Sequence, residues 1–317
     1  MILLFLAQAD IAEELAIQEA LKLPKPQAVQ KLDSLYKATG KPAFLSAKLD
    51  VLSRMGELKK ALAEAKAALK RYPSEPVFWE HLIRIAYNAG DKWTTRRALS
   101  AALSKFPKEP RLLHLAGVFW DNEGELGKAE DFYREAYALE PDSLLWGVHL
   151  ASLLVRTGRP SEALSVLEGV AQKLPQAETL SLTGTGIAKF LEIKNLLYEL
   201  HLVWGLAHDN LGGYHDAAAH YEEALKVRPW DPKISMRLAV VLWKMGRPDS
   251  GLKVVQGALE RHPESVDLHK VAGIVAYHAG KPSLAATELS FVIALRPDDY
   301  QAHYYLARSL SALGKLE

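Results

Sequence analysis

A glycine recurs at a fixed interval along this chain, and this interval restricts the possible architecture more than any other feature of the sequence. Gly56, Gly90, Gly124 and Gly158 are 34 residues apart. After one longer step the same spacing resumes in a second series, which consists of Gly212, Gly246, Gly280 and Gly314. A fixed period of this length indicates stacked copies of one small supersecondary unit.

A proline series follows the same interval. Its members are Pro73, Pro107, Pro141, Pro175, Pro229, Pro263 and Pro297. The glycine and proline series are both broken once, between the same two copies, by a step of 54 residues instead of 34. We interpret this break as one insertion of 20 residues, near 178–197, in an otherwise regular array.

Each period contains two amphipathic helices. Apolar side chains recur at helical spacing in VFWEHLIRIAYNAG, which ends at Gly90, and again in GGYHDAAAHYEEALKVRP, which ends at Pro229. Glycine favours the left-handed conformation that ends the first helix, whereas proline prevents the second helix from continuing. Small residues such as Ala217 and Ala224 allow the two helices to approach closely.

A 34-residue helix-turn-helix with Trp or Leu near its start, and with Ala, an aromatic residue, Ala and Pro in its second half, resembles the tetratricopeptide repeat. GELGKAEDFYREAYALEP and GGYHDAAAHYEEALKVRP carry the pattern most completely. Some copies depart from it, since Thr95 and Gly251 replace the small Ala and His201, His269 and His303 replace the early Trp. The resemblance implies an all-α fold, a right-handed superhelical solenoid of antiparallel helix pairs.

The period also predicts the organisation of the chain. Residues 1–41 are expected to form N-terminal capping helices, 42–177 repeats one to four, 178–197 the insertion (a loop plus a helix extension), 198–299 repeats five to seven, and 300–317 an unfinished eighth repeat. The pattern predicts another helix after the last residues. We therefore expect this sequence to be a fragment of a longer protein.

Charge and composition restrict the classes of partner and the compartments that this chain suits. The 39 Lys and Arg residues against 38 Asp and Glu leave a net charge of +1, too little to attract nucleic acid or anionic membranes over long range. No apolar run is long enough to span a membrane. The triplet Ala7-Gln8-Ala9 resembles a signal-peptidase site, but the segment before it lacks basic residues. We expect a capping helix here and a cytoplasmic protein, with the periplasm as the alternative.

The only glycine-spaced run that resembles a phosphate loop extends from Gly184 to Lys189. A phosphate loop needs G-x-x-x-x-G-K-[ST] between a strand and a helix. Here the spacing is wrong, Phe190 follows the lysine, and the pattern predicts no sheet. We therefore expect no nucleotide and no other cofactor, and we expect Ile187 onward to extend a helix.

Other potential chemical sites are weak. His208, His215 and His220 flank one turn, and we expect them to be solvated rather than to bind a metal. Without cysteine the chain has no thiolate, and it lacks the motifs of serine hydrolases and zinc proteases. We predict a protein without catalytic residues. Residues 91–111 hold six basic and two acidic residues, which we interpret as a solvated helix face, with a patch for an anionic partner as the alternative.

The resemblance also implies a binding groove, because in this family the first helices of the repeats line a concave face that holds peptides or extended segments. The corresponding positions in repeats two to four are polar: Glu80, Arg84, Tyr87, Asn88, Arg111, His114, Asp121 and Asn122. In repeats six to eight they are basic and aromatic: Lys233, Met236, Arg237, Trp243, Lys244, Lys270, Tyr277, His278, Tyr304 and Arg308, with Asp267 as the only acid. We expect this second set to bind a partner segment that carries carboxylates beside apolar side chains.

The family's carboxylate clamp for chaperone C-termini is only half matched. Lys233 and Arg237 fit its later half, but Leu202 and Leu206 occupy the earlier half. We therefore expect a protein-interaction scaffold for another protein or peptide partner. The alternative is a targeting or regulatory arm of a larger enzyme or envelope secretion machine that continues past residue 317.

Overall fold

The computed structural model describes residues 2–172 and 187–315, and over these residues it contains 17 helices and no strand. The expected all-α architecture of helix pairs is confirmed. The chain divides into two compact units, Met1–Glu140 and Pro141–Glu317. Most of the expected inserted loop, including Gly184 and Gly186 of the glycine run, lies outside the described residues.

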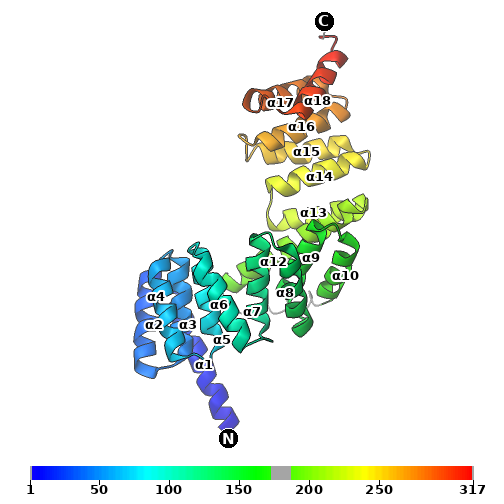
Figure 1. The fold of residues 1–317 in the computed structure, drawn as a ribbon. Helices are drawn as coiled ribbons and strands as arrows, with labels where there is room; N and C mark the ends of the chain where they lie inside the picture. The colour runs from blue at the N-terminus through cyan, green and yellow to red at the C-terminus, as the bar shows by residue number, and fades with distance from the viewer. Residues whose placement is uncertain (1, 173–186, 316–317) are drawn as a thin grey trace. The chain divides into compact units, whose positions relative to one another are not determined.

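The first unit consists of four successive helix pairs that lie side by side (Figure 1). Its helices are α1 (Ile2–Leu21), α2 (Lys25–Thr39), α3 (Pro42–Arg54), α4 (Leu58–Arg71), α5 (Pro76–Asn88), α6 (Lys92–Lys105), α7 (Pro110–Asn122) and α8 (Leu126–Leu139). The first helix α3 also packs against α5, and α5 packs against α7. One face of the unit is therefore built from first helices only.

The second unit repeats this arrangement (Figure 1). Its helices are α9 (Leu144–Arg156), α10 (Pro160–Ala171), α12 (Ile187–Asn210), α13 (Tyr214–Val227), α14 (Pro232–Lys244), α15 (Pro248–Leu259), α16 (Val266–His278), α17 (Pro282–Leu295) and α18 (Tyr300–Ala312). The first helices α14, α16 and α18 again pack on one another in order. Among the described helices none is both long enough and apolar enough to cross a membrane.

The periodic glycines end the first helix of each pair in the left-handed conformation, as their spacing predicts. Their φ angles lie between 67° and 81° at Gly56, Gly90, Gly124, Gly158, Gly212, Gly246, Gly280 and Gly314. No atom lies within 4 Å of a Cβ placed on any of these glycines. The backbone conformation, and not a lack of space, therefore requires glycine at the turn.

Inside two of the pairs, a second kind of glycine allows a tyrosine ring to lie against the backbone of the facing helix. A Cβ on Gly117 of α7 would lie 2.4 Å from the ring of Tyr133 on α8, and a Cβ on Gly205 of α12 would lie 2.5 Å from Tyr221 on α13. Tyr133 and Tyr221 are both buried. The residue opposite each tyrosine must therefore lack a side chain, because the ring occupies that volume.

Two of the three histidines that replace the early tryptophan, His269 and His303, keep one of its hydrogen bonds. The indole N–H of Trp79 donates to the carbonyl of Pro73 at 3.3 Å. The Nε2 atoms of His269 and His303 lie 2.9 and 2.8 Å from the carbonyl oxygens of the prolines six residues before them. A ring N–H at this position thus ties each helix to the turn that precedes it, and imidazole and indole both provide it.

Replacing Gly117 with alanine should destabilise the first unit by about 1–3 kcal/mol, because the new methyl group overlaps the Tyr133 ring. Gly127, near the start of α8, has open space around it and provides the matched control. Gly127→Ala should be neutral or stabilise by up to about 1 kcal/mol. Urea unfolding followed by circular dichroism measures both changes, and equal midpoints for the two variants would contradict the overlap.

Candidate functional site

The basic and aromatic candidate residues are carried by three neighbouring first helices of the second unit. Trp243 and Lys244 lie at the end of α14, Tyr277 and His278 at the end of α16, and Arg308 in the second half of α18. Because α14 packs on α16 and α16 on α18, equivalent ends of the three helices come together. Positions spaced across three repeats thus form one surface.

Five rings form a continuous group on this surface, the aromatic cluster, which consists of Trp243, Tyr277, His278, Tyr304 and Tyr305. Trp243 stacks on His278 with ring centres 4.2 Å apart and an angle of 24°. His278 meets Tyr305 edge to face at 5.6 Å, and Tyr305 meets Tyr304 in the same way at 5.1 Å. These are favourable aromatic geometries, so the rings hold one another in place.

Two observations qualify the prediction for this cluster. Tyr305 was not among the predicted residues, but it lies directly beside the predicted position Tyr304 and contacts both Tyr277 and His278. Burial in the cluster, together with the charge of Arg308, holds the pKa of His278 below its usual value. His278 is therefore held in its neutral form at pH 7, which suits a stacked ring.

Arg308 provides a positive charge at the edge of the aromatic cluster. Its guanidinium carbon lies 5.4 Å from the ring centre of Tyr277 and 5.5 Å from that of Tyr304. One of its N–H groups donates to the Tyr304 hydroxyl at 2.6 Å. Within the described part of the chain no carboxylate pairs with Arg308, so its charge stays available to an anionic group.

Two of the predicted lysines are already paired with acids of this chain. Lys244 lies 3.1 Å from Asp209, and Lys270 lies 2.8 Å from Asp299. The hydrogen bond from Lys270 is the main reason that the pKa of Asp299 is lowered. Asp267 is the only acid at the predicted helix positions, but Asp209 near the end of α12 and Asp299 just before α18 lie outside those positions and add two further acids.

The remaining predicted residues differ in exposure. Lys233 is exposed at the start of α14, and no acid pairs with it in the described residues. Arg237 is exposed. Burial raises the pKa of the Tyr221 hydroxyl, and the positive charge of Arg237 partly opposes this rise. Met236 packs against the apolar core of the second unit. Lys233 and Arg237 therefore join Arg308 as cations that pair with no acid of the described residues, whereas Met236 packs on the core, as Trp243 and Tyr277 also do in part.

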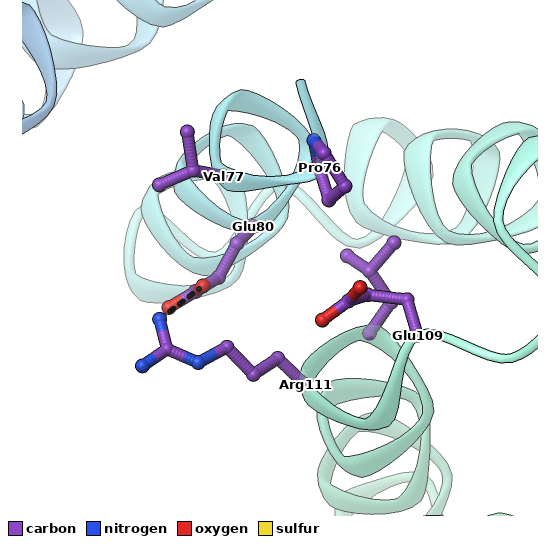
Figure 2. A pocket seen from close by; sticks show the side chains of 6 residues that line it. Pro76, Val77, Glu80, Glu109 and Arg111 are labelled. Carbon is purple, nitrogen blue, oxygen red and sulfur yellow. Dashed lines mark hydrogen bonds and ion pairs between the residues drawn. The ribbon is translucent and has the colours of Figure 1, made fainter. Parts of the chain in front are cut away.

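The corresponding face of the first unit carries internal ion pairs. Figure 2 shows a pocket of about 230 Å³ between the starts of α5 and α7, lined by Pro76, Val77, Glu80, Glu109, Arg111 and Leu112. Arg111 lies 3.3 Å from Glu80 and bridges the two helices at the pocket edge. Arg84 pairs with Asp50 of α3 in the same way. The charges of Arg111 and Glu80 at this pocket edge are therefore satisfied within the unit.

His114 does not line this face as predicted. Its side chain is buried, with its ring centre 5.6 Å from that of Tyr133 on α8. The helical period predicts the direction of the side chain at each position, but the His114 ring turns toward the paired helix α8. There Gly117 leaves room for the ring of Tyr133. His114 is therefore part of the packing within the pair.

The prediction of solvated turn histidines is wrong for two of the three residues. His215 is exposed, but His220 stacks on Trp204 at 4.5 Å and on His208 at 5.7 Å. The facing helices α12 and α13 bring these rings together, and the sequence distance between the residues concealed this contact. Among the described residues no group of His, Asp or Glu has the geometry of a metal site.

The His220 ring should remain neutral in solutions of moderate acidity. Burial, followed by the nearby His201 and His208, lowers the pKa of His220 to about 4. Because the unfolded chain takes up this proton near pH 6.5, stability should fall as the pH decreases from about 6.5 toward 4. Imidazole resonances followed by NMR titration measure the pKa directly.

Replacing His208 with glutamine should raise the pKa of His220, because one nearby positive charge is removed. His215→Gln is the matched control, since this histidine is exposed on the same helix as His220. A His220 ring that titrates with an ordinary histidine pKa in the unmodified chain would contradict the buried stack.

Comparisons with known proteins agree with the geometry. One sequence model of the tetratricopeptide repeat matches residues 122–183 and 211–273, and a second model of this repeat matches residues 47–92 and 271–317. The crystal structure of PilW, a type IV pilus biogenesis factor, superposes with a TM-score of 0.60 at 17% identity. The match covers 73% of this chain and 98% of that chain. At this identity the likeness supports the fold alone.

Two relatives differ in how much of their own length they share with this chain. Superkiller complex protein 3 of Mus musculus is 26% identical over 231 residues, which is 70% of this chain but only 14% of the mouse protein. TPR repeat-containing protein YpiA of Bacillus subtilis (strain 168) is 22% identical over 287 residues, 84% of this chain and 67% of its own length. The chain thus spans a small part of the mouse relative.

Proposed function

Because this chain belongs to the tetratricopeptide repeat family, whose members generally act as protein-interaction scaffolds, we propose that it binds a segment of a partner protein on the first helices of its second unit. The observation that carries this proposal is the aromatic cluster on α14, α16 and α18, with the uncompensated charge of Arg308 at its edge. Binding is the role, and no catalytic step is assigned to any residue.

The chemistry of the partner segment follows from these side chains. Trp243, Tyr277 and Tyr304 offer ring surface to apolar side chains, and Tyr304 is 52% exposed. Arg308, Lys233 and Arg237 pair with no acid among the described residues, so they suit carboxylates of the partner. Lys244 and Lys270 contribute less, because binding a carboxylate there requires competition with Asp209 and Asp299.

Two substitutions test this proposal on a partner recovered by affinity capture and identified by mass spectrometry. Trp243→Ala should weaken binding by about 2 kcal/mol, mainly through faster dissociation, because it removes a central aromatic anchor. Arg308→Gln should slow association and reduce the salt dependence, because it removes an uncompensated charge. Surface plasmon resonance at two salt concentrations separates these effects.

Lys253→Ala is the control, because this exposed lysine lies on α15, a second helix that carries none of the aromatic cluster. It should change neither rate constant by more than the experimental error. Unchanged binding in both test variants, with the fold intact by circular dichroism, would place the partner on another surface.

A second candidate function is that of a targeting or regulatory arm within a larger protein. The match to a small part of the mouse relative favours it. The length of the native protein, measured by mass spectrometry, distinguishes a free scaffold from such an arm. For either function we propose a cytoplasmic location, with the periplasm as the alternative, and no nucleotide or other cofactor.

A further inference from the structure

The first unit also carries an exposed aromatic residue, on a helix that the proposed function does not use. Trp93, near the start of α6, is 69% exposed. The guanidinium carbon of Arg97, one helical turn later, lies 5.2 Å from the centre of the indole ring. An indole that is exposed to this degree beside an arginine has the composition of an interface anchor rather than of a solvated helix face.

Two hollows flank Trp93 and share its side chain as a wall. The first, of about 380 Å³, is formed by α4, α5 and α6 and is lined by Lys66, the apolar side chains of Trp79 and Leu82 on α5, and Arg97. The second, of about 540 Å³, is a shallow and widely open depression along α6 beside Arg96, Arg97 and two serines. The first hollow suits an apolar side chain and the second a polar group. We call this area, with Lys66, Trp79, Trp93, Arg96 and Arg97, the Trp93 surface.

The charges around the Trp93 surface do not cancel. Lys92 and Arg96 share a single carboxylate, Glu123, at 2.6 and 3.9 Å. Asp91 lies near Lys66, but its side chain also accepts a hydrogen bond from the backbone N–H of Thr94, where it caps α6.

Arg97 makes no ion pair with any described residue. The four cations Lys66, Lys92, Arg96 and Arg97 thus lie near only two carboxylates, Asp91 and Glu123. The excess positive charge lies beside the exposed indole of Trp93.

The repeat itself does not require this pair of side chains. The position of Trp93 is occupied in the other copies by Lys59, Gly127, Ser161, His215, Asp249 and Ser283. The position of Arg97 is occupied by Ala63, Asp131, Ser165, Ala219, Lys253 and Thr287. A tryptophan followed by a cation therefore occurs in one copy only. Since the same helix forms without this pair elsewhere, packing within the repeat does not explain it.

We propose that the Trp93 surface binds a protein segment in which one or two carboxylates flank an aromatic or branched aliphatic side chain. The apolar side chain enters the hollow over Trp79 and Leu82, and a carboxylate pairs with Arg97. Arg97 binds it without being released from a carboxylate of the described residues. This site is distinct from the aromatic cluster of the second unit.

A protein segment fits this surface better than a nucleic acid. Binding of a phosphate backbone requires a series of uncompensated cations, whereas only two charges remain in excess here and the whole chain carries a net charge of +1. The first hollow also has an apolar floor formed by Trp79 and Leu82, which suits an apolar side chain better than a sugar-phosphate group.

A displayed library of random short peptides, selected in parallel on the full chain and on its Trp93→Ser variant, tests the proposal. Serine is the residue that two other copies carry at this position, so the variant should fold normally, and circular dichroism checks this. Peptides enriched only on the unmodified chain should contain Asp or Glu beside Phe, Trp, Leu or Ile. Enrichment of peptides without acids, or no difference between the two selections, would overturn the proposal.

The most enriched peptide is then synthesised and its affinity measured by fluorescence anisotropy. Trp93→Ser and Arg97→Ala should each weaken binding about tenfold or more, and replacing the peptide carboxylates with amides should do the same. Trp243→Ala and His215→Ala should leave the affinity unchanged, which separates this site from the aromatic cluster. Loss of binding in Trp243→Ala alone, or tighter binding of a single-stranded oligoribonucleotide than of the peptide at the Trp93 surface, would overturn the proposal.

Discussion

The close approach of the two helices within a pair is the constraint on which the rest of this structure depends. At α7 and α8, and again at α12 and α13, a tyrosine ring lies against a glycine of the facing helix, at a distance that leaves no room for a methyl group. Buried alanines such as Ala129 and Ala217 have the same effect on the second helices. Because interiors are close-packed, these contacts set the spacing within the pair, and therefore the spacing at which successive pairs stack.

Because successive helix pairs stack, equivalent residues of neighbouring repeats come into contact. Residues about one period apart meet between neighbouring first helices, as Arg84 does with Asp50 and as Lys244 does with Asp209. The second helices show the same kind of contact, because the hydroxyl of Tyr36 on α2 lies 3.2 Å from that of Tyr72, the residue after α4. Each repeat therefore contacts mainly its neighbours, and a binding surface arises wherever several adjacent copies place suitable residues at equivalent positions.

The period predicted most of the fold, because glycine, proline and the apolar pattern act locally and repeat in each copy. The helices end at the expected turns, and the left-handed glycines lie where the spacing placed them. The candidate site was predicted less completely. Helix positions identified Trp243, Tyr277 and Arg308, but Asp209 and Asp299 come from the ends of helices and pair with lysines that were expected to be free. The direction of His114 and the stack around His220 depend on facing helices, so a pattern along one helix did not reveal them.

Asp299 has two partners, and this links the candidate site to the start of a helix. It is the residue before α18, where its side chain accepts a hydrogen bond from the N–H of Ala302 at 3.0 Å, and it also pairs with Lys270. A carboxylate from outside that replaces Asp299 on Lys270 changes the electrostatic environment of the cap of α18. Occupation of this lysine and the order of the first turn of α18 are therefore thermodynamically linked, and each affects the other by the same free energy.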